Sequence, residues 1–191
     1  MIGPDRVIWR FDPIILTPEL SPYDDLIRSY AEGLGWDWRL LAAVIYQESK
    51  FHIEARSHRG AAGLMQMRSR TAARFGAGNL LDPEESIKAG AAFLSLLKKN
   101  FRNKAADEDE LQKFTLAAYN AGEGRITDCI NFADYLGKDS SHWDEIVSVI
   151  PQMRDSTILQ IDTVKHGIFH GYETIGYVDS VLELYEDFKT I

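Results

Sequence analysis

The chain has 191 residues, of which 45% are hydrophobic and 26% are charged, and its formal net charge is −8. This length and composition allow one sizeable hydrophobic core, so we expect a single globular domain. The acidic balance without a basic block excludes a typical nucleic-acid-binding protein. No apolar stretch approaches the roughly 18 residues of a membrane span, and the single cysteine, Cys129, excludes an internal disulfide.

Helix signals recur along the chain from Ser21 onward. The Ser21-Pro22 pair predicts a first helix that ends by Gly35, because proline favours the first helical turn and glycine the residue after the last. Asp37 is the predicted N-cap of the helix that leads to Glu48. Residues 69–76 predict a short helix that starts at a serine and stops at a glycine.

The second half of the chain continues this pattern. Residues 82–85 and 107–110 both have the spacing of a capping box, and each precedes a run with helical periodicity. Ser141 is the predicted cap of a helix over 142–150, which Pro151 closes. The stripe that begins at Val178 predicts the last helix, with Tyr177 at its start.

Strand-like alternation is confined to Val7 to Leu16. We therefore predict an all-α fold, or nearly so, with helices packed around a cleft. Residues 1–20 are assigned to an N-terminal extension or linker and residues 21–191 to the domain.

Glu48 combines a carboxyl group with an apolar helix face. Leu41, Val44 and Ile45 recur with Glu48 at helical spacing on one side of the second predicted helix. Burial there would raise the pKa of the carboxyl group and keep it protonated near neutral pH, as a general acid for glycosidic cleavage requires. The alternative is a core-edge glutamate that is paired with an arginine.

Further segments favour the catalytic interpretation. Residues 48–51 read Glu-Ser-Lys-Phe, residues 57–66 Ser-His-Arg-Gly-Ala-Ala-Gly-Leu-Met-Gln, residues 118–122 Ala-Tyr-Asn-Ala-Gly and residues 173–178 Glu-Thr-Ile-Gly-Tyr-Val. In this order and spacing they resemble the lysozyme-like catalytic domain of lytic transglycosylases, most of all the membrane-bound type F. The resemblance covers residues 21 to 188 and implies that 21–191 is a catalytic domain with a glycan-binding cleft.

The resemblance implies a mechanism with one carboxylate, whereas ordinary glycosidases use two. Glu48 would protonate the oxygen of the MurNAc–GlcNAc β-1,4 bond and then act as base toward the substrate's own C6 hydroxyl. The product would be a 1,6-anhydromuramoyl end, formed without water. No metal and no cofactor are implied.

The resemblance also implies substrate contacts for five residues. Ser57 would contact the sugar near the scissile bond, and Gln66 would hold an N-acetyl group. Tyr119 and Asn120 would border Glu48, and the hydroxyl of Tyr177 would lie near it. The structural alternatives are a turn cap for Ser57, backbone bonds for Gln66, core packing for Tyr119, a helix cap for Asn120 and a surface aromatic for Tyr177.

Two features depart from a simple match. Many relatives have a hydrophobic residue and then Met-Pro after the glutamine, whereas Met67, Arg68 and Ser69 follow Gln66 here. Arg68 would change the wall of a sugar subsite. His166 and His170 lie four residues apart, as a pair of metal ligands could. No third ligand is evident and the neighbouring glycines disfavour a helix, so we interpret both histidines as structural.

Three functions remain open from the sequence. The first is a lytic transglycosylase, the second a hydrolytic muramidase of the goose-lysozyme type, and the third a catalytically silent peptidoglycan-binding module. Glu48 together with Tyr119 and Tyr177 disfavours the third, because binding alone does not require a buried acid.

The resemblance implies the glycan strands of peptidoglycan as partner and export to the periplasm or the periplasmic face of the outer membrane. No signal peptide is visible in this sequence, so we expect a leader and a further domain to precede it. We expect a monomer.

Overall fold

The computed structural model describes residues 19–191, so the alternation from Val7 to Leu16 lies outside the described residues. The helices are α1 (Asp24–Leu34), α2 (Trp38–Ser49), α3 (Ser69–Ala73), α4 (Pro83–Phe101), α5 (Glu108–Ala121), α6 (Glu123–Tyr135), α7 (Trp143–Val149) and α8 (Tyr172–Lys189). Two 3-10 turns, η1 (Ile150–Arg154) and η2 (Ser156–Gln160), follow α7. Strands β1 (Ala61–Ala62) and β2 (Met67–Arg68) form a short antiparallel hairpin. The prediction of a nearly all-α fold is confirmed.

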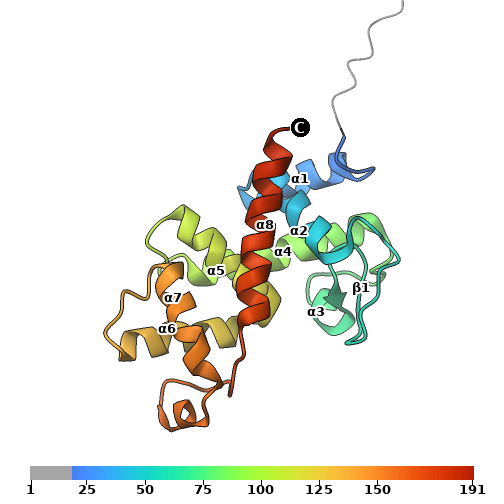
Figure 1. Ribbon diagram of the computed structural model, residues 1–191. Coiled ribbons are helices and arrows are strands. Elements are labelled where there is room, and N and C mark those ends of the chain that lie inside the picture. Colours follow the sequence, from blue (N-terminus) through green and yellow to red (C-terminus); the bar gives the residue numbers. More distant parts are fainter. Residues whose placement is uncertain (1–18) are drawn as a thin grey trace, which may run out of the picture.

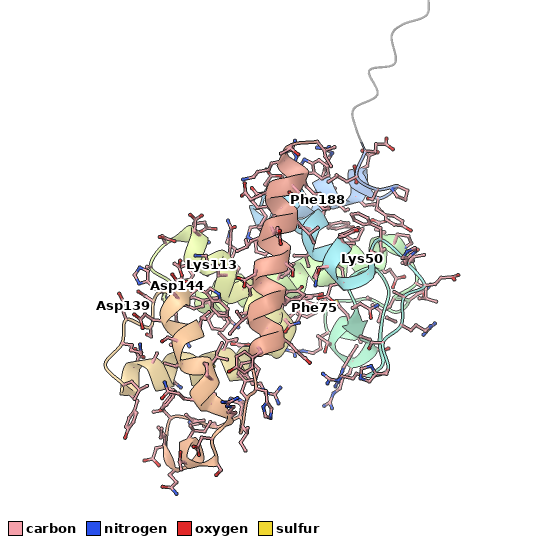
Figure 2. All side chains as sticks on the ribbon, in the orientation of Figure 1. Lys50, Phe75, Lys113, Asp139, Asp144 and Phe188 are labelled. Atoms are coloured by element: carbon pink, nitrogen blue, oxygen red, sulfur yellow. The ribbon has the colours of Figure 1, made fainter. Side chains whose placement is uncertain are left out.

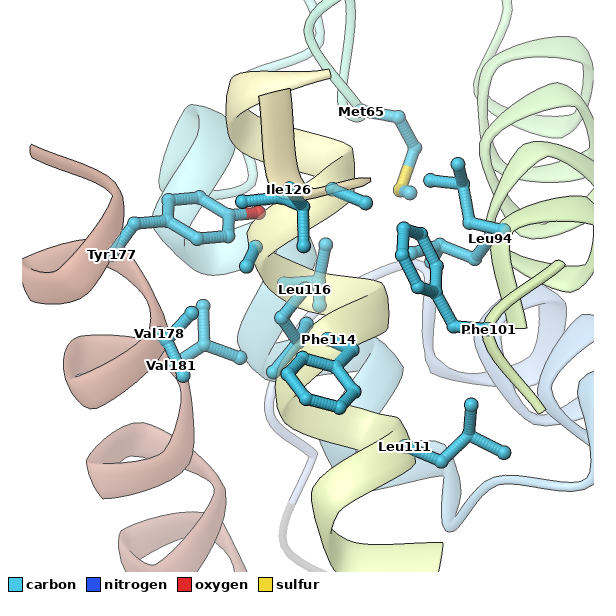
Figure 3. Close-up of a cluster of buried hydrophobic side chains, with 14 of the residues drawn as sticks. Met65, Leu94, Phe101, Leu111, Phe114, Leu116, Ile126, Tyr177, Val178 and Val181 are labelled. Atoms are coloured by element: carbon cyan, nitrogen blue, oxygen red, sulfur yellow. The ribbon is translucent and has the colours of Figure 1, made fainter. Parts of the chain in front are cut away.

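Helix α5 lies at the centre of the fold and contacts more helices than a peripheral helix does. It packs against α4, α6, α7 and α8, while α8 also packs along α2 (Figure 1). Leu111, Phe114 and Leu116 of α5 form the centre of a buried cluster, which Val178 and Val181 of α8 enter from one side (Figure 3). The core therefore ties helices that are far apart in the sequence to one element.

Side-chain caps start three of the helices as predicted. Asp37 accepts a hydrogen bond from the N–H of Arg39 at the start of α2. The carboxylate of residue 82 caps α4 and that of residue 107 caps α5 in the same way. At the end of α1, Gly35 has a φ of 66°, the left-handed conformation that glycine adopts without strain.

Two predicted boundaries are wrong. Ser141 does not cap α7: its hydroxyl donates to Asp139 instead, and α7 follows His142 without a side-chain cap. The end of α7 just before Pro151 is as predicted, and Pro151 lies in the first turn of η1, where its missing N–H costs no hydrogen bond. Helix α8 begins at Tyr172, six residues before the predicted stripe, so Tyr177 lies in its second turn.

Figure 2 shows the side chains on the two sides of α8. Lys50 and Phe75 lie on the side of α2, α3 and the hairpin, and Lys113, Asp139 and Asp144 lie on the side of α5 and α7. Within residues 19–191, no helix has the length and apolar character needed to cross a bilayer.

Candidate active site

Glu48 lies in the last turn of α2, three residues after a completely buried run from Leu41 to Ile45. Its carboxyl Oε1 accepts a hydrogen bond of 2.8 Å from the hydroxyl group of Tyr177. Burial raises the pKa of Glu48 to about 7, and the bond from Tyr177 opposes this rise because it stabilises the charged form. No ion pair to Glu48 forms within residues 19–191, which removes the alternative of a glutamate paired with an arginine.

Tyr177 lies behind Glu48. Its side chain is 7% exposed and projects from α8 toward the core, as Figure 3 shows. Burial, followed by the nearby charge of Glu48, raises the pKa of Tyr177 well above its usual value. Tyr177 is therefore a neutral donor at any ordinary pH, and it reaches a residue 129 positions away in the chain.

Tyr119 connects α5 to the loop that precedes the hairpin's second strand. Its hydroxyl group donates to the carbonyl oxygen of Met65 at 2.8 Å. Its ring packs at 5.4 Å from that of Phe93 on α4, with an angle of 44° between the planes. Burial and the charge of Glu48 raise the pKa of Tyr119 well above its usual value, so this hydroxyl also stays protonated.

Gln66 occupies an unusual backbone conformation. Its φ is +45°, in the left-handed region that side chains other than Gly and Asn rarely adopt. The side-chain Nε2 donates to the carbonyl oxygens of Ala55 and Gly63, at 3.0 and 2.9 Å. The amide nitrogen is thus used by the protein itself, and the amide oxygen is the atom that remains to receive a donor from a ligand.

The loop around Gln66 is shaped by close packing. A Cβ atom on Gly63 would lie 2.0 Å from the carbonyl oxygen of Leu80, and the φ of Gly63 is +78°. Only glycine fits there. Ser57 closes the same loop, because its Oγ accepts from the N–H of Ala61 at 3.0 Å. The hydroxyl hydrogen of Ser57 takes no part in that bond.

Asn120 links the end of α5 to the start of α8. Its Oδ1 accepts a hydrogen bond of 2.8 Å from the hydroxyl of Thr174, which is 2% exposed. Asn120 lies within α5 and is not its cap, since α5 continues to Ala121.

These residues surround a hollow of about 620 Å³, the catalytic hollow. Five of the six predicted site residues line it: Glu48, Ser57, Gln66, Tyr119 and Asn120. The sixth, Tyr177, does not line the hollow but donates a hydrogen bond to Glu48, which does. Glu48 is the only acidic residue among the described residues that lines this hollow.

Other lining residues were not singled out as ligand contacts from the sequence. They include Arg59, Phe93 and Arg125, together with Arg68, which forms part of the wall as the departure at that position suggested. Arg59 lies within the motif at residues 57–66, and Arg125 lies just after the motif at residues 118–122. This position near the motifs was the sequence signal that could have identified them as site residues. For Phe93 there was no such signal, because its spacing on α4 matches that of a core residue.

His166 contacts an acidic side chain of α6. The Nδ1 atom of His166 lies 3.2 Å from Oδ1 of Asp128, a buried carboxylate that also accepts the backbone N–H groups of Lys165 and His166. The segment between residues 163 and 171 is not helical. Across the described residues, no three or more His, Cys, Asp or Glu side chains are grouped as metal ligands would be.

Comparison with known proteins gives a consistent result. The family model described as the transglycosylase SLT domain matches residues 25–140. A curated relative from Aeromonas hydrophila subsp. hydrophila, named membrane-bound lytic murein transglycosylase F, is 36% identical over 167 residues. The match covers 87% of this chain and 33% of the relative. A relative of the same name from Maricaulis maris is 37% identical, covering 86% of this chain and 35% of its own length.

Solved structures agree with the family match. The 70 kDa soluble lytic transglycosylase from Escherichia coli aligns with a TM-score of 0.56 and 28% identity, over 87% of this chain and 24% of that chain. An inactive Glu-to-Gln mutant of the lytic transglycosylase Slt from Pseudomonas aeruginosa aligns with a TM-score of 0.58 and 26% identity, over 86% and 23%. The expected lysozyme-like helical fold is confirmed. The chain spans about a third of the length of the curated relatives it matches.

Proposed function

Because this chain belongs to the transglycosylase SLT domain family, we propose that it is a peptidoglycan lytic transglycosylase with Glu48 as its single acid and base. One observation carries the proposal: a glutamate whose pKa is raised to about 7 faces the catalytic hollow, and no second acid of the described chain lines it. A carboxyl group with this pKa can both give and accept a proton near neutral pH. The names of the relatives and solved neighbours support this reaction.

The first step is proton transfer from the carboxyl group of Glu48 to the oxygen that joins MurNAc to GlcNAc. The C–O bond on the muramoyl side breaks, the GlcNAc end leaves as an alcohol, and an oxocarbenium-like centre develops at the anomeric carbon. Glu48 is then a carboxylate. It takes the proton of the substrate's C6 hydroxyl while that oxygen bonds to the anomeric carbon. A 1,6-anhydromuramoyl end forms, no water is consumed, and Glu48 is protonated again.

The neighbours of Glu48 support both halves of this cycle. Tyr177 donates to Oε1 and so favours the carboxylate that exists after the first transfer. Burial has the opposite effect and favours the acid that begins the cycle. The two effects together hold the pKa near the pH at which the enzyme would work.

Gln66 and Ser57 can position the sugar. The amide oxygen of Gln66, whose nitrogen is held by two backbone carbonyls, can accept from the N–H of an N-acetyl group. The hydroxyl hydrogen of Ser57 can be donated to a sugar oxygen, since its oxygen alone is used in the loop. Both side chains are fixed by the protein before the substrate arrives, which lowers the entropic cost of orientation.

The masses of the released muropeptides test this proposal. Products with a 1,6-anhydro end are lighter by one water molecule than those of a hydrolytic muramidase, because an internal hydroxyl replaces water. Mass spectrometry of the digest of purified peptidoglycan should show the lighter series. A digest with only reducing-end muramic acid would identify a muramidase, and glycan binding without any release would identify a silent module.

The setting of the reaction follows from the substrate. Peptidoglycan lies outside the cytoplasmic membrane, so we infer that the protein is exported and acts in the periplasm or at the periplasmic face of the outer membrane. The relatives that are named membrane-bound support an exported location. We propose that the domain acts as a monomer.

A further inference from the structure

One face of α6 holds the segment that precedes α8. Gly124, Asp128 and Asn131 follow one another at helical spacing, so they lie on the same side of the helix. The side-chain amide of Asn131 donates to the carbonyl oxygen of Thr163 at 3.0 Å. Asp128 accepts the backbone N–H of His166 at 2.6 Å. The segment therefore runs along this stripe of α6 in the opposite direction to the helix.

Asp128 is the central contact of this stripe. Its carboxylate is 2% exposed, and a buried carboxylate is costly unless it is hydrogen-bonded. Its donors are the backbone N–H groups of Lys165 and His166, and its Oδ1 also lies 3.2 Å from Nδ1 of the His166 ring. One buried group on α6 thus fixes both the backbone of the segment and the orientation of the imidazole.

Gly124 provides the space for that imidazole. A Cβ atom on Gly124 would lie 2.4 Å from Nε2 and 2.5 Å from Cδ2 of His166. The backbone of Gly124 is helical and its φ is not positive, so alanine would suit the helix better than glycine does. The glycine is therefore required by the ring of His166 and not by its own backbone. We call Gly124, Asp128 and His166 the clasp.

The clasp acts on the part of α6 that borders the catalytic hollow. Gly122 and Arg125 line that hollow, and Gly124 lies between them. Helix α6 starts after Gly122 without a side-chain cap, and a glycine in the first turn weakens the helix further. Phe169, three residues after His166, also packs against Arg125, with 5.8 Å between the guanidinium carbon and the ring centroid. The segment before α8 therefore supports a turn that is weak by itself.

We propose that Asp128 and His166 are positioning residues, which hold the first turn of α6 in the conformation that forms a wall of the catalytic hollow. The inference rests on the proposed function, because the shape of this wall matters when a glycan occupies the hollow. Neither residue lines the hollow, so both act through the turn that they hold. The hydrogen bond from Tyr177 to Glu48 is made by other elements, and the clasp affects binding and not proton transfer.

Steady-state kinetics test the positioning role. His166→Ala removes the ring and its contact with Asp128 but keeps the backbone N–H. The KM for soluble glycan strands should rise about fivefold, kcat should stay within about twofold, and the pH dependence of kcat should not change. His142→Ala is the matched control, because the ring of His142 also contacts an aspartate, Asp139, at 3.1 Å on the surface. This control should leave KM unchanged.

A cycle of melting temperatures tests the clasp without any substrate. Gly124→Ala should lower the melting temperature of the wild type, because the new Cβ displaces the ring from Asp128. In the His166→Ala background the same change should instead raise it by about 2–4 °C, since alanine is the better helix former. Gly176→Ala is the control: Gly176 is exposed within α8 and its Cβ would meet nothing within 4 Å. It should raise the melting temperature in both backgrounds.

The two experiments have separate outcomes that would contradict the inference. If Gly124→Ala had the same effect in both backgrounds, the ring of His166 would not restrict this position and the clasp would be refuted. If folded His166→Ala had the KM of the wild type well below its melting temperature, the positioning role would be overturned. A change of sign in the cycle, together with a wild type that releases no muropeptides, would support the clasp and contradict the proposed function.

Discussion

The helices before α5 and those from α5 onward contribute to the site in different ways. The first region provides Glu48, Ser57 and Gln66, whose positions follow from a helix end and a tight loop within 19 residues of sequence. The second region provides Tyr119 and Tyr177, which reach back to Met65 and Glu48 across 54 and 129 positions. We infer that the first region carries the reacting groups and that the second adjusts and holds them.

The largest effect expected from this division is at Glu48. Glu48→Gln keeps the shape of the side chain but removes the proton donor, so turnover of peptidoglycan should fall by at least ~10²-fold. The variant should unfold at a temperature similar to that of the wild type. Glu54→Gln is the matched control, because Glu54 is an exposed acid six residues later that does not line the catalytic hollow. Near-normal turnover by folded Glu48→Gln would remove Glu48 from the mechanism.

The second largest effect is expected from loss of the Tyr177 hydroxyl. This loss should lower the rate by changing Glu48 and not by removing a contact with the substrate. Tyr177→Phe removes one hydroxyl, and a lost hydrogen bond to a charged or reacting group costs about 1.5–3 kcal/mol, or a roughly 10–150-fold lower rate. Tyr30→Phe removes an equivalent bond, from Tyr30 to Glu84, on the surface of the protein, and should keep full activity. Unchanged activity of Tyr177→Phe would reduce this residue to a packing role.

The pH profile separates a positioning role from loss of packing. Glu48 must be protonated to act as acid, and its pKa is raised to about 7, so kcat/KM should fall as the pH rises above about 7. The bond from Tyr177 lowers this pKa because it stabilises the carboxylate. Removing it in Tyr177→Phe should raise the pKa and move the alkaline limb to higher pH. If the alkaline limb of the pH profile stayed at the same pH in Tyr177→Phe, or moved to lower pH, the proposed effect of the Tyr177–Glu48 hydrogen bond would be contradicted.

A smaller effect is expected where the two regions are joined. Thr174→Val deletes the hydrogen bond that ties α8 to Asn120, which should cost about 1 kcal/mol of unfolding free energy, or about 2–4 °C. A slight shift of α8 should lower kcat/KM by about fivefold. Thr115→Val is the control, since Thr115 bonds only to a carbonyl within α5. It should lower stability and leave kcat/KM unchanged. Equal kinetics for both variants would show that α8 does not depend on this link.

The same division explains what the sequence could predict. The helix starts at Asp37 and Asp107 were predicted correctly because caps are local signals. The proposed catalytic role of Glu48 was suggested by an apolar stripe, which is also a local feature. The early start of α8 was missed because tertiary packing, including the burial of Thr174, stabilises a first turn that lacks a side-chain cap.

Long-range features were the least predictable from the residues. The spacing of Tyr177 gave no indication that its ring is buried and lies behind the acid, because its contact with Glu48 depends on how α8 packs along α2. The resemblance placed its hydroxyl near the acid without giving this geometry. Arg59 and Arg125 are 66 positions apart, and only the fold brings them to a common wall.

The smallest expected effect concerns metal ions. His166 is bonded to the buried carboxylate of Asp128, which also accepts two backbone N–H groups. These bonds hold the segment before α8 to α6, and the proposed reaction uses only side chains and the substrate's own hydroxyl. Treatment with a chelator should therefore leave the melting temperature and the rate of muropeptide release unchanged. Asp128→Asn should lower the melting temperature, since Asp128 is 2% exposed and its bonds to the backbone would weaken. Activity that is lost with chelator and restored by zinc would instead assign His166 to a metal site and refute the metal-free mechanism.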